Sequence, residues 1–260
     1  MADVLEAVCA AAAPYGLNLL AAIPAARYDA QAAVAMRTGA LDPSARSIIV
    51  IANGGGAFWQ AFTAHRTANP GWATRANPLD DFTRVTVENR IIPALIATGV
   101  GATVVYPFVA AGPTLNFMEL GKLAGIAGPS ILGVVVNPVF GPWIAFRAAI
   151  LIDREIDAPG SAIGFDPCPT CTARSCIPAC PVGAVSSAAG WDIPACLTYR
   201  VEREAECAPR CHARGACVLG PEHRYPDDEL IYHQERALRA MRPYYETHIR
   251  PGRVAQKSSK

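Results

Sequence analysis

The chain has 260 residues, of which 52% are hydrophobic, and this is enough for a substantial buried core and excludes overall disorder. Its 23 Lys and Arg residues nearly balance its 22 Asp and Glu residues, so no net charge favours nucleic acid or an anionic membrane surface as a partner. The first residues include Asp3 and Glu6 and lack the basic start of a secretory signal, so we expect a cytoplasmic protein.

Helical and strand patterns alternate over the first 155 residues, which predicts an α/β domain. A glycine turn ends one of the strands, and a proline interrupts one of the helices. We expect helices over residues 2–14, 56–66, 82–99 and 116–128, and strands over residues 17–23, 47–56 and 101–109.

The most apolar segment, residues 131–152, has the length of a membrane span. It contains an Asn-Pro pair, a Gly-Pro pair and Arg147, however, and a charge near the centre of a bilayer is costly. We therefore predict two strands joined by a turn, in a sheet that is covered on both faces, and no membrane span.

The composition changes at residue 157, where Pro and Cys become dense and strand patterns disappear. We predict a first domain over residues 1–156, a cysteine module over 157–220, and a C-terminal helix and tail over 221–260 that packs back on the first domain. An amphipathic pattern places the helix of this last part at residues 227–242.

Eight of the nine cysteines lie between residues 168 and 217. In a cytoplasmic chain of this size, such crowding indicates ligation of a metal or a cluster more than disulfide bonds. Only Cys9 lies elsewhere, and we interpret it as a small buried hydrophobic residue.

The first four of these cysteines follow the spacing C-x2-C-x4-C-x3-C-P. The bacterial motif for [4Fe-4S] clusters is C-x2-C-x2-C-x3-C-P, and its fourth cysteine ligates a second cluster, so only the middle gap departs, by two residues. The four later cysteines bring the total to the eight that two clusters need. This logic predicts one cluster on Cys168, Cys171, Cys176 and Cys217, and another on Cys180, Cys196, Cys207 and Cys211.

Two alternatives remain open. C-x2-C and C-x3-C pairs also suit tetrahedral zinc sites, although zinc does not require the Cys-Pro pair and the small-residue turn that follows it. A redox or disulfide role without a metal is the other alternative.

The chain resembles the epoxyqueuosine reductases, which join a corrinoid-binding α/β domain to a module with two clusters. The resemblance follows the order of the chain and rests on residues 16–29, 77–85, 119–156 and 168–200, the last including CPTC, ACPVGAV and CLTYR. FGPWIAFRAAILI and GPEHRYPDDELIYH also resemble the cobalamin-processing chaperones, which have a related fold and no clusters. The resemblance implies an α+β fold: a nitroreductase-like α/β sandwich, then a ferredoxin-like module with two [4Fe-4S] clusters, then a C-terminal helix.

The resemblance also implies a base-off cobalamin over the sheet, reduced by the two clusters, with a ferredoxin or flavodoxin as electron donor. A corrin needs a wide apolar bed with close backbone approach. Candidates for this bed are Gly121, Gly125, Gly128 and Gly133, although these glycines would equally permit tight packing of the chain. Further candidates for the cavity are Tyr106, Asn116 and Trp143.

One departure from the epoxyqueuosine reductases concerns the proton donor. Those enzymes carry an Asp before the glycine-rich helix, whereas the corresponding segment here, YPFVAAGPTLNF at 106–117, contains no acid. General acid catalysis needs a proton source within hydrogen-bond reach. Because the chain also has no basic excess, we do not expect tRNA as its substrate.

Arg147 and His223 are the candidates for contact with a substrate. A cation among apolar strand residues needs a partner, so Arg147 is expected to bind an anion, or alternatively to point outward from an exposed strand face. His223 is a candidate for proton transfer, and His212, next to Cys211, is a candidate cluster ligand. We expect the other three histidines, His65, His233 and His248, at the surface.

These patterns together predict an iron-sulfur reductase that binds a corrinoid and acts on it or on a small molecule. A noncatalytic electron carrier or cobalamin escort is the second hypothesis. A zinc-stapled α/β protein without a redox role is the third.

Overall fold

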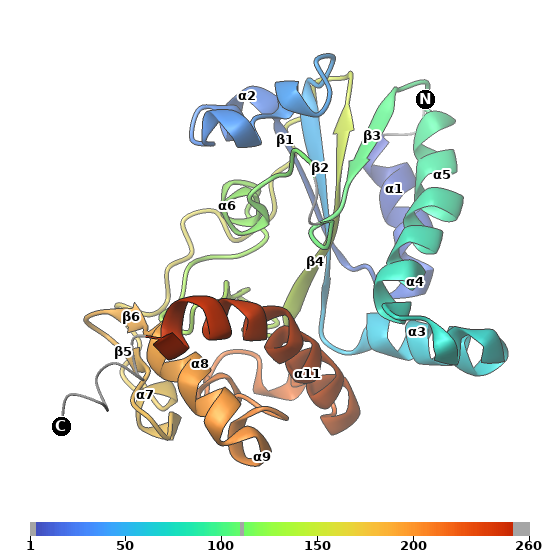
Figure 1. Cartoon of the computed structure of the whole chain (residues 1–260). Coiled ribbons are helices and arrows are strands. Elements are labelled where there is room, and N and C mark those ends of the chain that lie inside the picture. Colours follow the sequence, from blue (N-terminus) through green and yellow to red (C-terminus); the bar gives the residue numbers. More distant parts are fainter. Residues whose placement is uncertain (1–3, 110–111, 252–260) are drawn as a thin grey trace.

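A computed structural model describes residues 4–109 and 112–251 of the chain. Its centre is a four-stranded sheet in the order β1-β2-β4-β3, in which every neighbouring pair is antiparallel (Figure 1). The strands are β1 (Leu19–Pro24), β2 (Ser47–Gly54), β3 (Ala102–Val105) and β4 (Ile144–Ile152). The fold is therefore α+β, as predicted, because helices and strands alternate along the chain while the strands run antiparallel.

Helices cover both faces of this sheet, and we call this part the sheet domain (Figure 1). One core includes Ile49 and Ile51 of β2, and the core on the opposite face includes Ile48 and Val50. Successive strand residues point to opposite faces, so a strand covered on both sides must be apolar throughout. On one side lie α1 (Val4–Ala12), α3 (Ala57–Ala68), α4 (Pro78–Thr86) and α5 (Ile92–Ile96), and on the other α2 (Ala25–Asp29) and α6 (Phe117–Leu123).

The helix expected over 82–99 is longer and less regular than predicted. It runs from α4 through a π-helical turn, Val87–Ile91, into α5. Pro93 has no N–H to donate to the preceding turn, and the π-helical turn lies just before it, where the regular helical hydrogen bonding is interrupted. Short 3-10 helices complete this domain at Ala13–Tyr15, Val34–Met36, Thr38–Ala40 and Pro70–Thr74.

Of the two strands predicted over residues 131–152, the second is confirmed and the first is wrong. Only the second half of this segment forms a strand, β4, whereas residues 131–136 form a loop that pairs only through the isolated bridge of Gly128 with Val136. The apolar side chains at the start of this loop, Ile131 and Leu132, pack against cysteines of the following module instead of a sheet.

Arg147 occupies an irregularity in β4. In the pairing with β2, Ile51 lies opposite Ala148 and Ala52 lies opposite Phe146, so Arg147 is one extra residue. A bulge of this kind turns a side chain away from the direction that strict alternation gives it.

The cysteine module consists of short elements joined by loops. They are α7 (Cys176–Ala179), β5 (Val185–Ser186), β6 (Gly190–Trp191), α8 (Ile193–Glu202), α9 (Glu204–Cys207) and α10 (His212–Gly215). A 3-10 turn, Pro221–His223, leads to the long helix α11 (Asp227–Tyr244), which continues as a π-helical turn, Tyr245–Ile249. The helix predicted over 227–242 is confirmed.

Helix α11 joins the two parts of the molecule. On one side, Trp59 Nε1 donates a hydrogen bond to Asp228 at 2.9 Å, and the Leu79 N–H donates one to the Tyr232 hydroxyl at 3.2 Å. On the other side, Leu238 packs with Leu197 of α8 in a small core. The C-terminal helix thus packs back on the sheet domain and on the cysteine module alike.

The boundary predicted near residue 156 stays a prediction, because the chain remains against the sheet domain beyond it. Ala158 forms a β-bridge with Ala22, and the Gly160 backbone packs on Gly125. Among residues 4–109 and 112–251, no helix has both the length and the apolar character that crossing a membrane would take.

Candidate metal and cofactor site

Four cysteines from separate elements line one cavity of about 360 Å³ between the cysteine module, β4 and α11. We call them the Cys180 set: Cys180, Cys196, Cys207 and Cys211. Cys196 comes from α8, whose first turn is capped by the Asp192 side chain, which accepts the Ala195 N–H at 2.9 Å.

The other four cysteines line a second cavity of about 160 Å³. We call them the Cys168 set: Cys168, Cys171, Cys176 and Cys217. Leu132 lines both cavities, so the loop that replaces the predicted strand forms a wall between the two sets. The two groups of four are those that the cluster motif predicts.

The electrostatic neighbours of the buried thiols follow the same division. Burial raises the pKa of Cys207 to about 11, and the nearby thiols of Cys211, Cys196 and Cys180 raise it further. Burial likewise raises the pKa of Cys176, with Cys217 as the next cause. The thiols of Cys207 and Cys176 are thus influenced by members of their own sets, and the raised pKa favours the neutral thiol of each unless a positive ion or cluster binds it.

Backbone amides point at two sulfurs of the Cys180 set. The Ala184 N–H donates to Cys180 Sγ at 3.3 Å, and the Arg214 N–H donates to Cys211 Sγ at 3.4 Å. Such N–H to sulfur bonds stabilise negative charge on cluster ligands and help to set their reduction potential.

The arrangement of the thiols bears on which metal group fits. The eight cysteines of the two sets form no disulfide bond, and among the described residues no three or more His, Cys, Asp or Glu side chains form a group that could hold a metal ion. Each set of four thiols lines one cavity instead. Four thiol donors are the number that a tetrahedral zinc ion takes and also the number that a [4Fe-4S] cube takes. The donor set of each cavity therefore fits either group.

The four glycines predicted to lie beneath a corrin ring all pack closely against other atoms of the protein. A Cβ atom on Gly121 would lie 2.1 Å from the Phe146 ring, and one on Gly128 would lie 1.7 Å from the Phe165 carbonyl oxygen. Gly125 and Gly133, both at positive φ, approach Gly160 and Trp191 in the same way. Close packing within the chain accounts for all four glycines, and their role toward a corrin stays a prediction.

Tyr106 and Asn116, the other predicted cofactor residues, are engaged within the protein. Tyr106 is buried, and its hydroxyl donates to Glu88 at 3.1 Å. The Asn116 side chain caps α6 by accepting the Glu119 N–H at 3.1 Å. The segment 106–117 that lacks an acid lies between them, apart from residues 110 and 111, which are outside the described residues.

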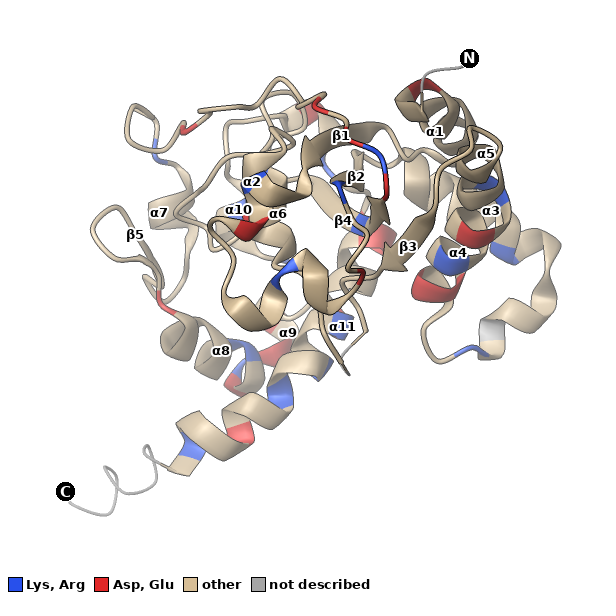
Figure 2. Cartoon of the chain, turned by 90° about the horizontal axis from the view of Figure 1, so that it is seen from above, with Lys and Arg blue, Asp and Glu red and all other residues tan. Residues whose placement is uncertain are grey.

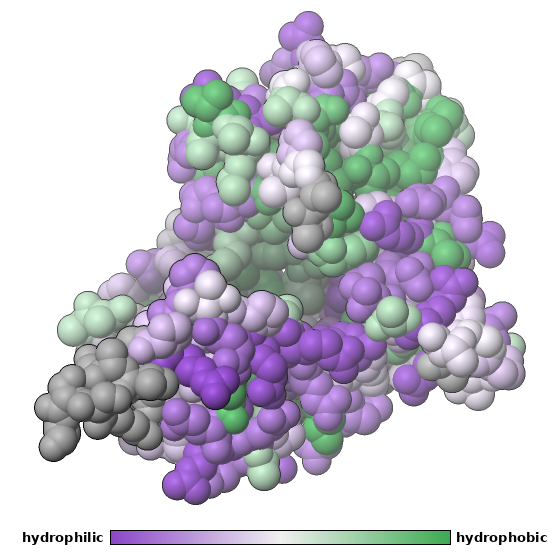
Figure 3. All heavy atoms as spheres, viewed as in Figure 1, coloured by the Kyte–Doolittle hydropathy of each residue, from purple (hydrophilic) through white to green (hydrophobic). Residues whose placement is uncertain are grey.

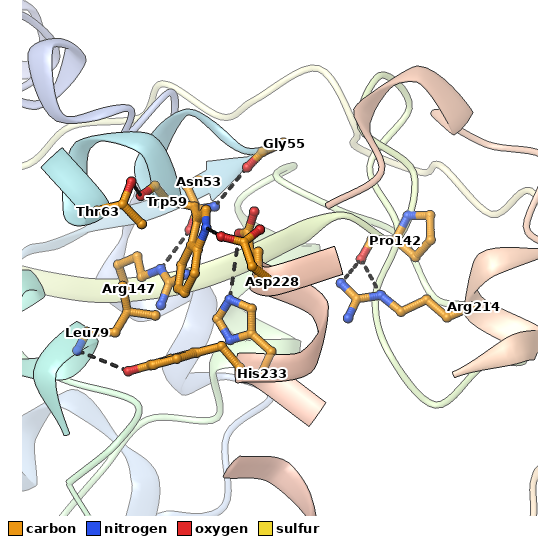
Figure 4. A network of polar contacts seen from close by, with 12 residues as sticks. Asn53, Gly55, Trp59, Thr63, Leu79, Pro142, Arg147, Arg214, Asp228 and His233 are labelled. Atoms are coloured by element: carbon orange, nitrogen blue, oxygen red, sulfur yellow. Dashed lines mark hydrogen bonds and ion pairs between the residues drawn. The ribbon is translucent and has the colours of Figure 1, made fainter. Parts of the chain in front are cut away.

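Arg147 is buried, so the alternative of an outward strand position is wrong. The bulge in β4 directs it toward β2, where its Nε donates to Asn53 at 2.6 Å, and its guanidinium lies over the Phe58 ring at 4.5 Å (Figure 4). Its direct hydrogen-bond partner is therefore a neutral amide, and burial lowers the pKa of Arg147.

Two residues near Arg147 were missed or misplaced in the sequence interpretation. His233 is not at the surface as expected: its ring lines the cavity of the Cys180 set, and its Nε2 lies 3.7 Å from Glu229 Oε1. Glu229 is only 1% exposed, and burial raises its pKa to about 8. The spacing of Glu229 and His233 was a signal in the sequence, since residues four apart lie on the same face of a helix. The amphipathic pattern did not show that this face is buried.

The remaining candidates lie at the edge of the module. His223 packs on the Phe140 ring at 4.6 Å and lines neither thiol cavity. His212 lines the larger cavity, and its Nε2 lies 2.9 Å from the Glu206 carbonyl oxygen. Trp143 is buried beneath the Arg214 guanidinium, which lies 4.7 Å from its ring.

The surface is hollowed between the sheet domain and the helices α8 and α11 (Figure 3). Residues on the sheet-domain side of the hollow are mainly hydrophobic, whereas α11 presents hydrophilic residues. The larger thiol cavity carries an apolar wall of Leu132, Val134 and Ile144, and Val134 is 37% exposed, so this wall reaches the surface.

Charged residues of both signs are mixed over the helices. Figure 2 shows basic and acidic segments alternating along α11 and around α8 and α9, without a face of one sign. This distribution agrees with the net charge of +1.

No protein-family model and no curated protein sequence matches the chain. Solved structures do match it, although distantly. The B12-trafficking protein CblC of C. elegans is 11% identical, with 89% of this chain and 90% of that chain covered and a TM-score of 0.56. Epoxyqueuosine reductase of Bacillus subtilis is 14% identical, with 86% and 68% covered and a TM-score of 0.55. The chain shares its fold with these proteins.

A catabolic reductive dehalogenase is a further structural match, at 16% identity and a TM-score of 0.52. The match covers 92% of this chain and 36% of the dehalogenase, so the chain spans about a third of that enzyme. These matches support, at the level of the fold, the relationship that the sequence resemblance suggests.

Proposed function

We propose that this protein is an iron-sulfur reductase that holds two [4Fe-4S] clusters and passes electrons from them to a corrinoid. The observation that carries the proposal is the sorting of eight thiols, distributed over 50 residues of sequence, into two sets of four around two separate cavities. Four thiolates for each cluster is the number that a [4Fe-4S] cube needs.

The two sets are interleaved in the sequence, which brings their cavities together. Cys180 lies only four residues after Cys176 yet belongs to the other set, and α7 packs against α10, which follows Cys211. Shared walls such as Leu132 make the path between the two clusters short. Electrons entering at one set would therefore reach the other without crossing solvent.

The hollow beside the Cys180 set is the place that we propose for the corrinoid. Its apolar wall of Leu132, Val134 and Ile144 matches the largely apolar surface on which a macrocycle lies. Bound there, a corrinoid would supply a cobalt centre that changes oxidation state and exchanges its axial ligands. The fold supports this assignment, because solved structures with it include a B12-trafficking protein.

For the substrate we propose the corrinoid itself or a small molecule. The view in Figure 2 contains no basic face of the kind that nucleic acid binding requires, and the segment 106–117 contains no acid. The electron donor that we propose is a ferredoxin or a flavodoxin.

The clusters are tested by purifying the protein without oxygen and measuring iron, sulfide and the electron paramagnetic resonance spectrum. We expect about eight irons per chain. Cys207→Ala and Cys176→Ala should each remove about four irons, from the Cys180 set and the Cys168 set respectively. Cys9→Ala, which belongs to neither set, is the control and should keep all of them. A colourless protein with zinc would refute the proposal.

Corrinoid binding is tested by titrating the protein with cob(II)alamin. We expect the spectrum of the base-off form, and no spectral change at saturating corrinoid would refute this part of the proposal. Val134→Asp, which places a charge on the apolar wall, should weaken binding, whereas Val139→Asp, at an exposed position, should not.

A noncatalytic cobalamin escort is the second candidate, and one observation favours it. The match with the B12-trafficking protein covers 90% of that chain, more than the 68% covered in the epoxyqueuosine reductase. A single-turnover experiment, in which the prereduced protein is mixed with cob(II)alamin, separates the reductase from the escort. A reductase transfers an electron to the bound cob(II)alamin, and an escort does not.

A further inference from the structure

Glu229 is a buried carboxyl group without a direct partner. Its side chain is 1% exposed, and neither carboxyl oxygen has a hydrogen-bond partner among the described residues. The nearest basic group is His233, whose Nε2 lies 3.7 Å from Glu229 Oε1, one turn along α11. A charged carboxylate in such a place would carry a large desolvation cost, so the neutral, protonated form is favoured.

His233 connects this carboxyl group with the cavity of the Cys180 set. Its ring lines that cavity, whereas its Nε2 is buried on the side of Glu229 and makes no hydrogen bond. Aromatic rings hold the imidazole in place: the centroids of Trp59, Tyr225 and Tyr232 lie 6.2, 5.7 and 5.7 Å from that of His233. Figure 4 shows His233 pointing from α11 toward the network around Arg147 and Asn53.

Burial favours a single proton on the pair, although Arg147 and Arg214 act in the opposite direction on Glu229 by lowering its pKa. Burial raises the pKa of Glu229 to about 8, and burial lowers the pKa of His233 to about 3, with the surrounding arginines as further causes for the imidazole. At neutral pH, Glu229 therefore carries the proton and His233 is neutral. The charged groups that act on the pair are Arg147 of β4, Arg214 of α10, and Asp228 and Arg236 of α11.

We propose that Glu229 and His233 form a proton relay that reaches the wall of the cavity of the Cys180 set and supplies protons to the group reduced in the hollow beside it. The relay rests on the proposed function, since it needs electrons from the clusters. It places a proton source where the segment 106–117 provides no acid.

One proton and one electron move in each step of the relay. The Glu229 O–H bond breaks as an N–H bond forms at His233 Nε2, through a small rotation or one bridging water, since 3.7 Å exceeds a hydrogen bond. The other ring nitrogen then gives up its proton to the substrate atom that has received the electron and become basic. To reset the pair, the Nε2 proton returns to Glu229 while the other ring nitrogen takes a proton from solvent, and an electron from a ferredoxin or flavodoxin returns to the clusters.

The proton on Glu229 is tested by infrared spectroscopy, which needs no cluster. Wild-type protein at pH 7 should show the band of a protonated carboxyl group, and this band should vanish as the pH rises through about 8. Glu229→Gln should lack the band, and Glu235→Gln, an exposed glutamate on the same helix, should keep it. If wild-type protein lacks the band, Glu229 is ionised and the relay is refuted, whatever the iron content.

The coupling to electrons is tested by redox titration of the anaerobic holoprotein at several pH values. Reduction of the Cys180 cluster adds negative charge near the pair and strengthens its hold on a proton, so the midpoint potential should fall as the pH rises above about 8. The potential should lose this dependence in Glu229→Gln and keep it in Glu235→Gln. In His233→Gln the carboxyl group still titrates, so the dependence should remain, and the rate of proton uptake that accompanies reduction should fall. His233→Gln should still show the infrared band, which provides a second variant if Glu229→Gln does not fold.

The outcomes separate the relay from the proposed function. Protein with about eight irons and a potential that is independent of pH refutes the relay and leaves the reductase proposal standing. Protein that binds no iron refutes the reductase proposal, and the relay with it.

Discussion

The sheet domain and the cysteine module differ in what holds them together. In the sheet domain, two large cores cover both faces of four strands, and residues such as Ile49, Phe62 and Leu95 are fully buried. The cores in and beside the module are small: Cys176, Val185 and Ala213 form one, and Leu197, Ala208, Leu238 and Tyr245 form the other.

The secondary structure shows the same difference. The helices α7, α9 and α10 have four residues each, and the strands β5 and β6 have two each. Helices this short are not stable by themselves, because the free-energy cost of helix nucleation exceeds the gain from the hydrogen bonds of a single turn. The sheet domain is thus stabilised by apolar burial. The module has little such burial, and the proposed clusters would supply part of its folding free energy.

The largest expected effect is on the module when its clusters are removed. Chelation of iron under mild oxidation should unfold residues 166–220, because metal binding supplies folding free energy where the core is small. Hydrogen exchange measured by mass spectrometry should show loss of protection in α7 to α10 and retained protection in β1 to β4. Equal loss in both parts would show that the two do not differ in this way.

A core substitution in the sheet domain should give the opposite pattern. Phe62 is fully buried and contacts the rings of Trp59 and Phe82, so Phe62→Ala should lower the free energy of unfolding by about 3–5 kcal/mol. Ile96→Ala, at a side chain that is 56% exposed, is the control and should cost far less. Denaturant unfolding, monitored by the circular dichroism of the β-strands, measures this loss. The iron content of the native protein should remain unchanged.

Glu229 of α11, the helix that joins the sheet domain and the cysteine module, should make the free energy of unfolding depend on pH. The folded protein holds the Glu229 proton up to about pH 8, whereas the unfolded chain releases it near the ordinary value of 4.5. The free energy of unfolding should therefore fall as the pH rises from 6.5 to 8, by at most about 1.4 kcal/mol per pH unit. Below pH 6.5, His233 acts in the opposite direction, because the unfolded imidazole takes up a proton that the folded one does not.

The measurement is urea unfolding at pH 6.5 and pH 8. Glu229→Gln should remove the fall in stability between these values, and Glu235→Gln should behave as wild type. Identical losses in wild type and Glu229→Gln would show that the carboxyl group is ionised throughout this range.

The smallest expected effect concerns the ion pair of Arg27 with Asp157, which links α2 to the start of the predicted module. The two groups lie 2.6 Å apart, but their side chains are 37% and 47% exposed. Because water screens such a pair, Arg27→Ala should change the free energy of unfolding by less than about 1 kcal/mol. Thermal unfolding measures it, and a larger loss would show that this contact holds the two parts together.

Much of the sheet domain was predictable from the sequence. The strand over residues 47–56 was predicted, the apolar run of β4 predicted a sheet covered on both faces, and the amphipathic pattern predicted α11. The strand predicted over residues 131–136 was wrong, because a short apolar run has the same sequence pattern in a β-strand and in a loop that lines a cavity. The surface position expected for His233 was also wrong, because an amphipathic pattern shows that a helix has two faces and not what covers each one.

The sequence by itself determined the alternation of elements, since this depends on spacing along the chain. Its cysteine spacing predicted two groups of four thiols. The tertiary structure alone decided that the strands are antiparallel, that the predicted glycines face Phe146, Gly160, Phe165 and Trp191, and that a bulge turns Arg147 toward Asn53. It also placed Glu229 and His233 beside the cavity of the Cys180 set. The reason is physical: spacing determines which side chains share a face, whereas burial and unpaired polar groups arise only when distant segments pack together.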